Sequence, residues 1–316
     1  MPNTIDRSTI VRGPGSVTLG AVQMFDSEGI KAALKVDTFE VPVSAFGNVD
    51  TRRKDITAAI TFRPCGALTA EILAALFPHG TPVIGASLLG VADVSCVIHS
   101  LAGTKVTFAA AALSKMPSLK LSAGAPAFSG EAEITCLLAN DTDRTDADSL
   151  FVVAAEAWAG AFDVADILGG VYTGVLGTGE TAVTIATQDG WQVDFEMEVE
   201  PQACDGVGTY DLLLKSVTVR AKCIPLGLTE ATHLALLNAQ DTGAVIGGTM
   251  RSGKDLVISC PDALTVTLKE AALVEGPMAW GNNQLRSGEI GFVAHRTVTG
   301  GVPAALFSVA LTPVAP

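Results

Sequence analysis

The sequence is poor in aromatic and charged side chains. Of its 316 residues, 5% are aromatic and 17% are charged, whereas 48% are hydrophobic. Three Trp and two Tyr leave few rings on which nucleic-acid bases could stack. A chain with this much apolar material can form packed cores, which argues against disorder, and its length accommodates two ordinary domains.

Cysteine pairs of the Cys-x-x-Cys type are absent, although the chain has six cysteines. Most of them lie in apolar, strand-like stretches, so we expect buried free thiols. No apolar stretch typical of a secretory signal follows Met1, so the sequence does not support secretion. The longest apolar stretch, residues 150–177, contains three carboxylates and is excluded as a membrane span, so we expect a soluble protein without membrane insertion. The cysteines are Cys65, Cys96, Cys136, Cys204, Cys223 and Cys260.

Positive charge is also scarce, and the net charge of −13 is unevenly distributed. Lys and Arg number 11 against 11 acidic residues in residues 1–140, 1 against 7 in residues 141–170, and 8 against 15 in residues 171–316. The acidity therefore belongs to the middle and the second part. Such a chain repels phosphate groups, because nucleic-acid binding depends on neutralisation by Lys and Arg.

Catalytic and metal-binding signatures are missing as well. The four histidines lie far apart and have no second ligand at metal-binding spacing, and no Gly-x-Ser-x-Gly elbow occurs. We therefore expect no metal, no cofactor and no enzymatic activity. A catalytic triad assembled only in space would escape this search. The histidines are His79, His99, His233 and His295.

Two phosphate-binding patterns occur, each in the wrong context. Residues 248–255 match a P-loop up to Lys254, but Asp255 stands where a Ser or Thr should ligate magnesium, and a strand-like stretch follows. Residues 177–182 match the dinucleotide pattern Gly-x-Gly-x-x-Ala, again before a strand-like stretch. Both patterns need a helix at that point to bind phosphate, so we expect β-turns.

A weak internal repeat runs through the chain at an offset of about 160 residues. Short blocks recur in the same order and at similar spacing in both parts. The matched blocks are residues 64–69 with 225–229, 83–85 with 245–247, 106–108 with 266–268, 111–113 with 271–273, and 129–131 with 287–289. Because order and spacing agree, a tandem duplication explains them better than chance, and both parts are expected to share a fold.

Within each part, short runs rich in Val, Ile and Thr are bounded by Gly, Pro and Asp, which is typical of antiparallel strands. One helix per part is expected, over residues 70–77 after a Thr69 cap and over residues 229–238. We predict an α+β, mainly β fold, with two tandem β-sandwich or barrel-like modules that each carry one flanking helix. The modules are residues 1–140 and 171–316. Residues 141–170 form an acidic connection, with a helix expected within residues 149–168.

The most informative stretch is residues 193–200, where apolar and acidic residues alternate. Period two places Val193, Phe195, Met197 and Val199 on one face of a strand and four carboxylates on the other. This second face is expected to be strongly negative. It is a solvated outer face, a surface past which a polyanion slides, or, as the weakest alternative, a calcium site. The carboxylates are those of Asp194, Glu196, Glu198 and Glu200.

Several stretches of the first part resemble the major tail tube proteins of long-tailed, siphovirus-like bacteriophages. They are residues 12–18, 35–41 together with 45–50, 103–108 and 115–117. The resemblance covers roughly residues 10–140 and reaches the second part mainly through the repeat. None of these stretches is a catalytic signature.

This resemblance implies a structural protein that self-assembles into stacked rings around a central channel, the conduit for DNA during ejection. It also implies sheets that join between subunits and an arm or loop that reaches a neighbouring copy. The two arm candidates are residues 40–55 and 200–214. The residues singled out in them are Arg52, Arg53 and Lys54, and Asp205, Gly206 and Gly208. The acidic face of Asp194, Glu196, Glu198 and Glu200 is the candidate for the channel wall.

Tubes of this family are commonly six-fold, so two modules per chain imply three chains per ring, a homotrimeric pseudo-hexamer. Expected partners are further copies of the chain, a tape measure protein, tail terminator and baseplate or tip proteins, and DNA in transient, non-specific passage. The expected location is the virion tail, with the host cytoplasm during assembly. Two alternatives stay open: a duplicated β-sandwich binding module for carbohydrate or surface adhesion, and an enzyme such as a nucleotide hydrolase built on Lys254.

Overall fold

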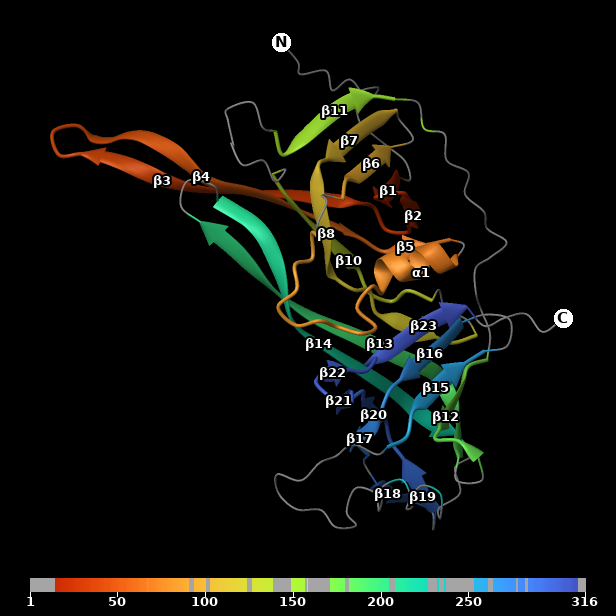
Figure 1. The fold of residues 1–316 in the computed structure, drawn as a ribbon. Helices are drawn as coiled ribbons and strands as arrows, with labels where there is room; N and C mark the ends of the chain where they lie inside the picture. The colour runs from red at the N-terminus through yellow and green to blue at the C-terminus, as the bar shows by residue number, and fades with distance from the viewer. Residues whose placement is uncertain are drawn as a thin grey trace.

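The computed structural model describes residues 15–311 except for positions 67, 91–93, 101–102, 124–126, 139–148, 157, 159–170, 180–181, 205–207, 227–231, 233–235, 237–252, 261–263, 277 and 282–283. Strands dominate these residues and form several antiparallel sheets, accompanied by the helix α1 (Figure 1). The expected α+β, mainly β fold is therefore confirmed.

The first part of the chain contributes two sheets. One has the strand order β11-β7-β6-β1-β2-β5, and the other has the order β3-β4-β10-β8. The bounds of the first are β1 Gly15–Leu19, β2 Val22–Asp26, β5 Pro64–Cys65, β6 Cys96–Ser100, β7 Thr104–Phe108 and β11 Phe151–Ala155. The bounds of the second are β3 Lys31–Val43, β4 Gly47–Phe62, β8 Ala110–Lys115 and β10 Ala132–Leu137.

The second part is organised around a long hairpin of β13 (Val183–Cys204) and β14 (Gly208–Leu226). Its sheet has the order β17-β20-β14-β13-β12-β15-β16-β23, and β9 (Leu119–Leu121) of the first part pairs with β13. The remaining bounds are β12 Thr173–Leu176, β15 Leu256–Ser259, β16 Leu264–Leu268, β17 Ala272–Glu275, β20 Ile290–Val293 and β23 Phe307–Leu311. Two separate ribbons are β18 Met278–Gly281 with β19 Gln284–Ser287, and β21 Val298–Thr299 with β22 Val302–Pro303.

The helix α1 (Ala70–Leu76) forms where the sequence indicates. Thr69 caps it, with its hydroxyl accepting a hydrogen bond from the Ile72 amide at 3.3 Å, and the helix ends at Phe77. Hydrogen bonds with its own backbone amide and with the Thr69 side chain hold the pKa of Glu71 below its ordinary value. Leu73 and Leu76 are buried, so the apolar stripe of the helix packs inward as expected.

The helix expected in the second part, over residues 229–238, lies almost entirely outside the described residues. Thr232 and Leu236 are described and are helical, and Leu236 is buried.

A second expectation, of a helix within residues 149–168, is wrong for residues 151–155. These residues form β11, which pairs antiparallel with β7, and the rings of Phe151 and Phe108 lie 5.7 Å apart. The β-branched Val152 and Val153 favour a strand once the free edge of β7 offers hydrogen-bond partners. Residues 157 and 159–170 lie outside the described part of the chain.

The main hydrophobic core runs across both parts of the chain. Phe77 after α1 contacts Phe195 of β13, with ring centroids 4.7 Å apart, and Phe195 contacts Phe307 of β23 at 5.0 Å. The two parts therefore bury apolar surface against each other. Strand order also recurs, because β3-β4-β10-β8 has the same connectivity as β13-β14-β20-β17. The tandem duplication itself stays a prediction.

Among the residues that the structure describes, no helix has both the length and the apolar character needed to cross a bilayer.

Candidate assembly surface

The acidic stretch lies in the middle of β13, and its alternation is as expected. Val193 and Phe195 are buried, and Met197 and Val199 are half-buried. Asp194 is half-buried, whereas Glu196, Glu198 and Glu200 are exposed. One face of the strand therefore belongs to the core, and the carboxylates line the other.

The neighbouring strand β14 places cations on that same outer face. The Lys215 ammonium lies 2.7 Å from the Glu198 carboxylate, and the Arg220 guanidinium lies 3.7 Å from that of Glu196. The Lys215 ammonium holds the pKa of Glu198 below its ordinary value. The expectation of a strongly negative face is therefore wrong in this part, because the cross-strand partners make the surface mixed in charge.

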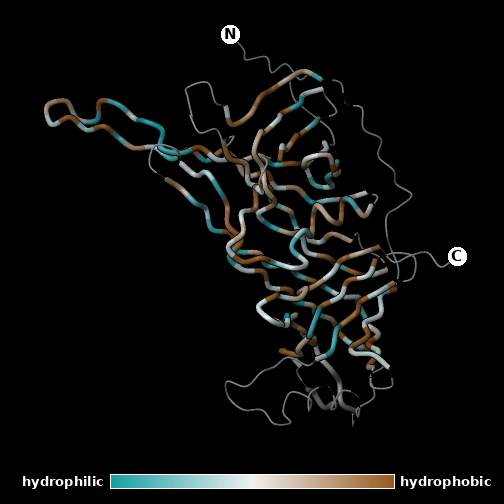
Figure 2. Tube along the Cα trace, in the orientation of Figure 1, coloured by the Kyte–Doolittle hydropathy of each residue, from teal (hydrophilic) through white to brown (hydrophobic). Residues whose placement is uncertain are grey.

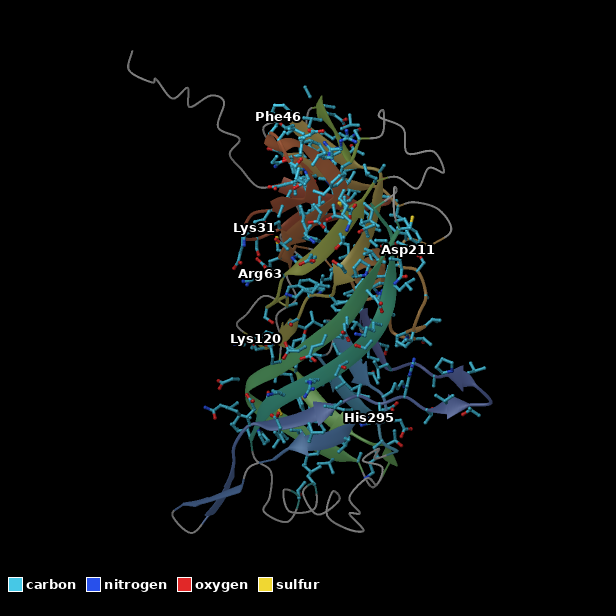
Figure 3. The ribbon with its side chains drawn as sticks, turned by 90° about the vertical axis from the view of Figure 1, so that its left-hand side faces the viewer. Lys31, Phe46, Arg63, Lys120, Asp211 and His295 are labelled. Carbon is cyan, nitrogen blue, oxygen red and sulfur yellow. The ribbon has the colours of Figure 1, made fainter. Side chains whose placement is uncertain are left out.

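Further cations continue the pattern at both edges of this face. Lys222 of β14 lies 3.0 Å from Glu275 of β17 and 3.6 Å from Glu289. These two carboxylates raise the pKa of Lys222. Lys120 of β9, labelled in Figure 3, is exposed and stands opposite Gln192 in the ladder. Carboxylates are still more numerous than cations on the face, but Glu196, Glu198, Glu275 and Glu289 are in ion pairs.

The β3–β4 hairpin extends from the body of the molecule as an arm (Figure 1). From Lys31 to Phe39 every residue of β3 is exposed, and so are residues 48–54 of β4. Apolar side chains recur along it, as the brown segments of Figure 2 show. Their exposed fractions are Leu34 53%, Val36 46%, Phe39 48%, Phe46 82% and Val49 52%. A two-stranded ribbon with exposed apolar residues is marginal on its own and marks an interaction surface.

The three basic residues of the first arm candidate lie in the distal half of β4. Arg52 makes an ion pair with Asp50 at 3.0 Å, and Arg53 and Lys54 are exposed. Residues 40–55 are thus the end of a β-hairpin, with its turn at residues 44–46.

The second arm candidate, residues 200–214, is the end of the β13–β14 hairpin. Asp205 and Gly206 lie outside the described residues, and Gly208 opens β14 with a φ of 76°. This hairpin end rests on the first part of its own chain. The Thr209 hydroxyl donates to the Asp55 carboxylate at 2.5 Å, and the Ser87 hydroxyl donates to Asp211 at 2.6 Å.

A small apolar cluster stabilises the same contact between the β13–β14 hairpin end and the first part of the chain. Leu212 of β14 packs with Ala110 and Ala112 of β8 and with Leu137 of β10, and Val199 packs against this cluster. The β13–β14 hairpin is therefore docked within the chain, whereas the similar β3–β4 hairpin is exposed.

An open groove of about 850 Å³ lies between the arm and the docked hairpin. Charges of both signs line it, including Lys35 and Asp37, which form an ion pair at 3.5 Å, and Lys54 and Asp55. The Ser114 hydroxyl faces Glu133 and Thr135 rather than a histidine. In this groove Lys35 pairs with Asp37, and the Asp55 and Glu133 carboxylates accept hydrogen bonds from the Thr209 and Ser114 hydroxyls.

The phosphate-binding patterns have the β context that the sequence indicates. Strand β15 follows Lys254 and Asp255, so the helix that a P-loop requires is absent from this described stretch. Asp255 accepts hydrogen bonds from Lys269 at 2.7 Å and from the Glu270 amide at 3.1 Å. Gly177 and Gly179 have φ of 83° and 67° in the turn between β12 and β13. Residues 248–252 lie outside the described residues.

None of the six cysteines is in a disulfide, and four of them are buried as expected. The expectation is wrong for Cys204, which is exposed near the end of β13, and only partly met by Cys65, which is half-buried. Burial raises the pKa of the Cys223 thiol to about 12. The thiols of Cys96 and Cys136 interact in the core, which raises the pKa of Cys136.

No group of three or more His, Cys, Asp or Glu side chains suited to a metal ion occurs in the described part of the chain. No known family model matches the sequence, and no curated protein is significantly similar to it.

Proposed function

We propose that this chain is a structural protein whose copies assemble into stacked rings, forming the tail tube of a long-tailed bacteriophage through which DNA passes. The observation that carries the proposal is the β3–β4 arm. Residues 31–40 of β3 are all exposed, and Phe46 at the turn is 82% exposed. Exposed apolar residues on an isolated ribbon favour burial against another molecule.

The sheet edges support the same proposal. Strand β3 is the edge of its four-stranded sheet over 13 residues. A long edge strand leaves backbone N–H and C=O groups available for pairing with another chain. Closure of such edges around a ring removes them, as closure does in a β-barrel.

The outer face of β13 and β14 is the candidate for the channel wall. Asp194, Glu196, Glu198 and Glu200 of β13 outnumber Lys215, Arg220 and Lys222 of β14 on it. Ion pairs occupy part of the carboxylates, which leaves a weakly negative, polar surface. DNA passing such a surface gains little from counterion release and does not adhere.

The carbohydrate-binding alternative has less support, because sugar-binding surfaces use exposed Trp and Tyr rings. Trp191 and Tyr172 are 0% and 2% exposed, and Tyr210 of β14 is 37% exposed, so a single Trp or Tyr ring is exposed among those whose side chains the structure describes. Trp158 is half-buried, and its indole N–H donates to Ser16 at 3.4 Å. The enzyme alternative built on Lys254 loses its P-loop context, since β15 follows directly. We further propose the partners expected above: further copies, a tape measure protein, and tail terminator and tip proteins.

Electron microscopy of the purified chain over a range of concentrations tests this function. We expect rings or tubes with a central channel, because arm and edge contacts both favour association. A chain that stays monomeric at high concentration, with neither rings nor tubes on the grid, would overturn the proposal.

A further inference from the structure

The long hairpins of the two parts have different neighbours at their outer edges. In the second part, β13 is covered by β9, with Trp191 opposite Leu121, Gln192 opposite Lys120, and Val193 opposite Leu119. In the first part, β3 has β4 as its ladder partner and is the edge of its sheet. The strand registers place these two edges at equivalent positions of the two parts.

The β3–β4 and β13–β14 ladders correspond residue by residue. Lys31 pairs with Thr61, and Gln192 pairs with Lys222, each 161 positions later. Both ladders then have two irregularities at equivalent positions. In the β3–β4 ladder they lie between Asp37 and Thr38 and between Val41 and Pro42. In the β13–β14 ladder they lie between Glu198 and Val199 and between Gln202 and Ala203. Ile30, Lys31 and Ala32 therefore correspond to Trp191, Gln192 and Val193.

The strand β9 also has a counterpart, β18. The ladder from Cys96 opposite Phe108 recurs as Leu256 opposite Leu268, which sets an offset of 160. After β9 the offset is 158, because Ile134 opposite Ile60 recurs as Phe292 opposite Ala221. The bridge between Leu119 and Phe128 therefore corresponds to the pair Ala279 and Arg286 in the β18–β19 hairpin, at offsets of 160 and 158. The strand Met278–Gly281 is thus equivalent to the strand that covers β13, and it pairs with β19 alone in the described residues.

Leu34 next to the β3 edge is more exposed than its counterpart on β13, as expected when no strand covers β3. Phe195 is 3% exposed and contacts Phe77 of the first part, whereas its counterpart Leu34 is 53% exposed. The glycines at equivalent positions of the two edges differ likewise. A Cβ on Gly190 would lie 2.2 Å from the Leu121 carbonyl oxygen, while a Cβ on the equivalent Gly29 meets nothing within 4 Å. The β3 edge is shaped like the β13 edge but is uncovered.

We propose that a second copy of this chain adds its strand Met278–Gly281, antiparallel, to the β3 edge. The register transferred from β9 and β13 places Gly281 opposite Ile30, Trp280 opposite Lys31, and Ala279 opposite Ala32. The second part of that copy covers Leu34, as the first part covers Phe195. In Figure 1, β3 and the β18–β19 hairpin lie at different ends of the chain, so the contact is head-to-tail.

This proposal rests on the proposed function, because it names the contact by which the copies join around a ring. A head-to-tail contact yields a closed ring when its rotation closes. The contact within the chain and the contact between chains are then equivalent, and three chains supply six modules. Ring closure uses every free β3 edge and every free β18 strand.

Cross-linking of paired cysteines tests the register. The variant carries Ala32→Cys and Ala279→Cys in a Cys204→Ser background, and assembled protein is treated with a short bifunctional maleimide. Residues directly opposite in antiparallel strands have Cα atoms about 4.5–5.5 Å apart, within reach of such a reagent. We expect covalent dimers and trimers on a denaturing gel, with the ladder ending at three chains.

The controls are each single cysteine variant and the pair Val152→Cys with Ala279→Cys, because Val152 is 60% exposed on the other sheet. Rings or tubes with no more cross-linking than these controls would refute the strand pairing and leave the proposed function standing. Cross-linked dimers in a preparation without rings or tubes would support the pairing and contradict the tube. Absence of both assemblies and cross-links would overturn both.

Discussion

At the residue scale, the outer face of β13 is defined by its pairing with β14. Glu198 accepts hydrogen bonds from the Lys215 ammonium at 2.7 Å and from the Ser216 hydroxyl at 3.2 Å. The lowered pKa of Glu198 means that its charge is kept at neutral pH and is lost as the pH falls through that lowered pKa. Cations on the neighbouring strand therefore determine how negative this face is, which we propose as the channel wall.

Reversal of this face should make the assembly adhere to DNA. In the variant Glu196→Lys with Glu198→Lys, rings or tubes should still form, because both side chains are solvent-exposed. Duplex DNA should sediment with them and dissociate as salt increases, since added lysines release counterions from the phosphates. The control is Glu198→Lys with Lys215→Glu, which preserves the net charge and should bind no more DNA than the unmodified chain. Failure of the double variant to assemble would instead place these carboxylates in an interface.

At the element scale, the junction of the two parts depends on the pairing of β9 with the start of the β13 hairpin. Gly190 has a φ of 84° and lies against the backbone of Leu121 and the side chain of Ser122. Glycine is favoured there for two reasons: the left-handed conformation disfavours a side chain, and β9 lies too close to leave room for a Cβ atom. The same position in the first part, Gly29, has a φ of 101° and open space.

Substitution of Gly29 and Gly190 should distinguish the cost of a side chain at positive φ from the cost of its overlap with β9. Gly29→Ala should lower the free energy of unfolding by about 1–2 kcal/mol, the cost of a non-glycine residue at positive φ. Gly190→Ala should cost roughly 1–3 kcal/mol more, because its Cβ overlaps the Leu121 carbonyl and displaces β9. Urea unfolding of the two variants measures the difference. Equal losses would mean that β9 does not constrain Gly190.

Hairpin ends show a second contrast at this scale. The β13–β14 end is docked through Thr209, Asp211 and Leu212, so residues 208–214 are occupied within the chain. The β3–β4 end has no equivalent anchor among the described residues. Of the two stretches singled out for reaching a neighbouring copy, the β3–β4 end is the one that the fold leaves available.

At the scale of the whole molecule, the arm is the part of the chain that we propose to contact other copies. The substitution Phe46→Asp should change the stability of the monomer by no more than about 0.5 kcal/mol, because Phe46 is 82% exposed. It should raise the concentration at which rings or tubes appear, since a charge replaces apolar surface that association buries. Thermal unfolding and concentration-dependent light scattering measure the two effects. Val298→Asp, at a residue 60% exposed on the separate β21–β22 ribbon, is the matched control. Unchanged assembly of Phe46→Asp would remove the arm turn from the interface.

The proposed ring of three chains, with six modules, predicts an uneven distribution of charge. Residues 1–140 carry no net charge by count, and residues 171–316 carry −7. If modules alternate around a ring, neutral and acidic modules alternate with them. The two kinds of position would then contribute unequally to the channel wall.

The sequence by itself determined what depends on neighbours along the chain. Alternation in residues 193–200 fixed which face of β13 is buried, Thr69 fixed the start of α1, and Gly177 and Gly179 indicated a turn rather than a phosphate loop. Only the tertiary structure decided what depends on partners far away. The pairing of Lys215 with Glu198, the strand at Phe151–Ala155 and the docking of Thr209 on Asp55 each join segments that local pattern does not connect. The physical reason is that propensity and capping act over a few residues, whereas edge pairing and charge compensation follow from which strands become adjacent.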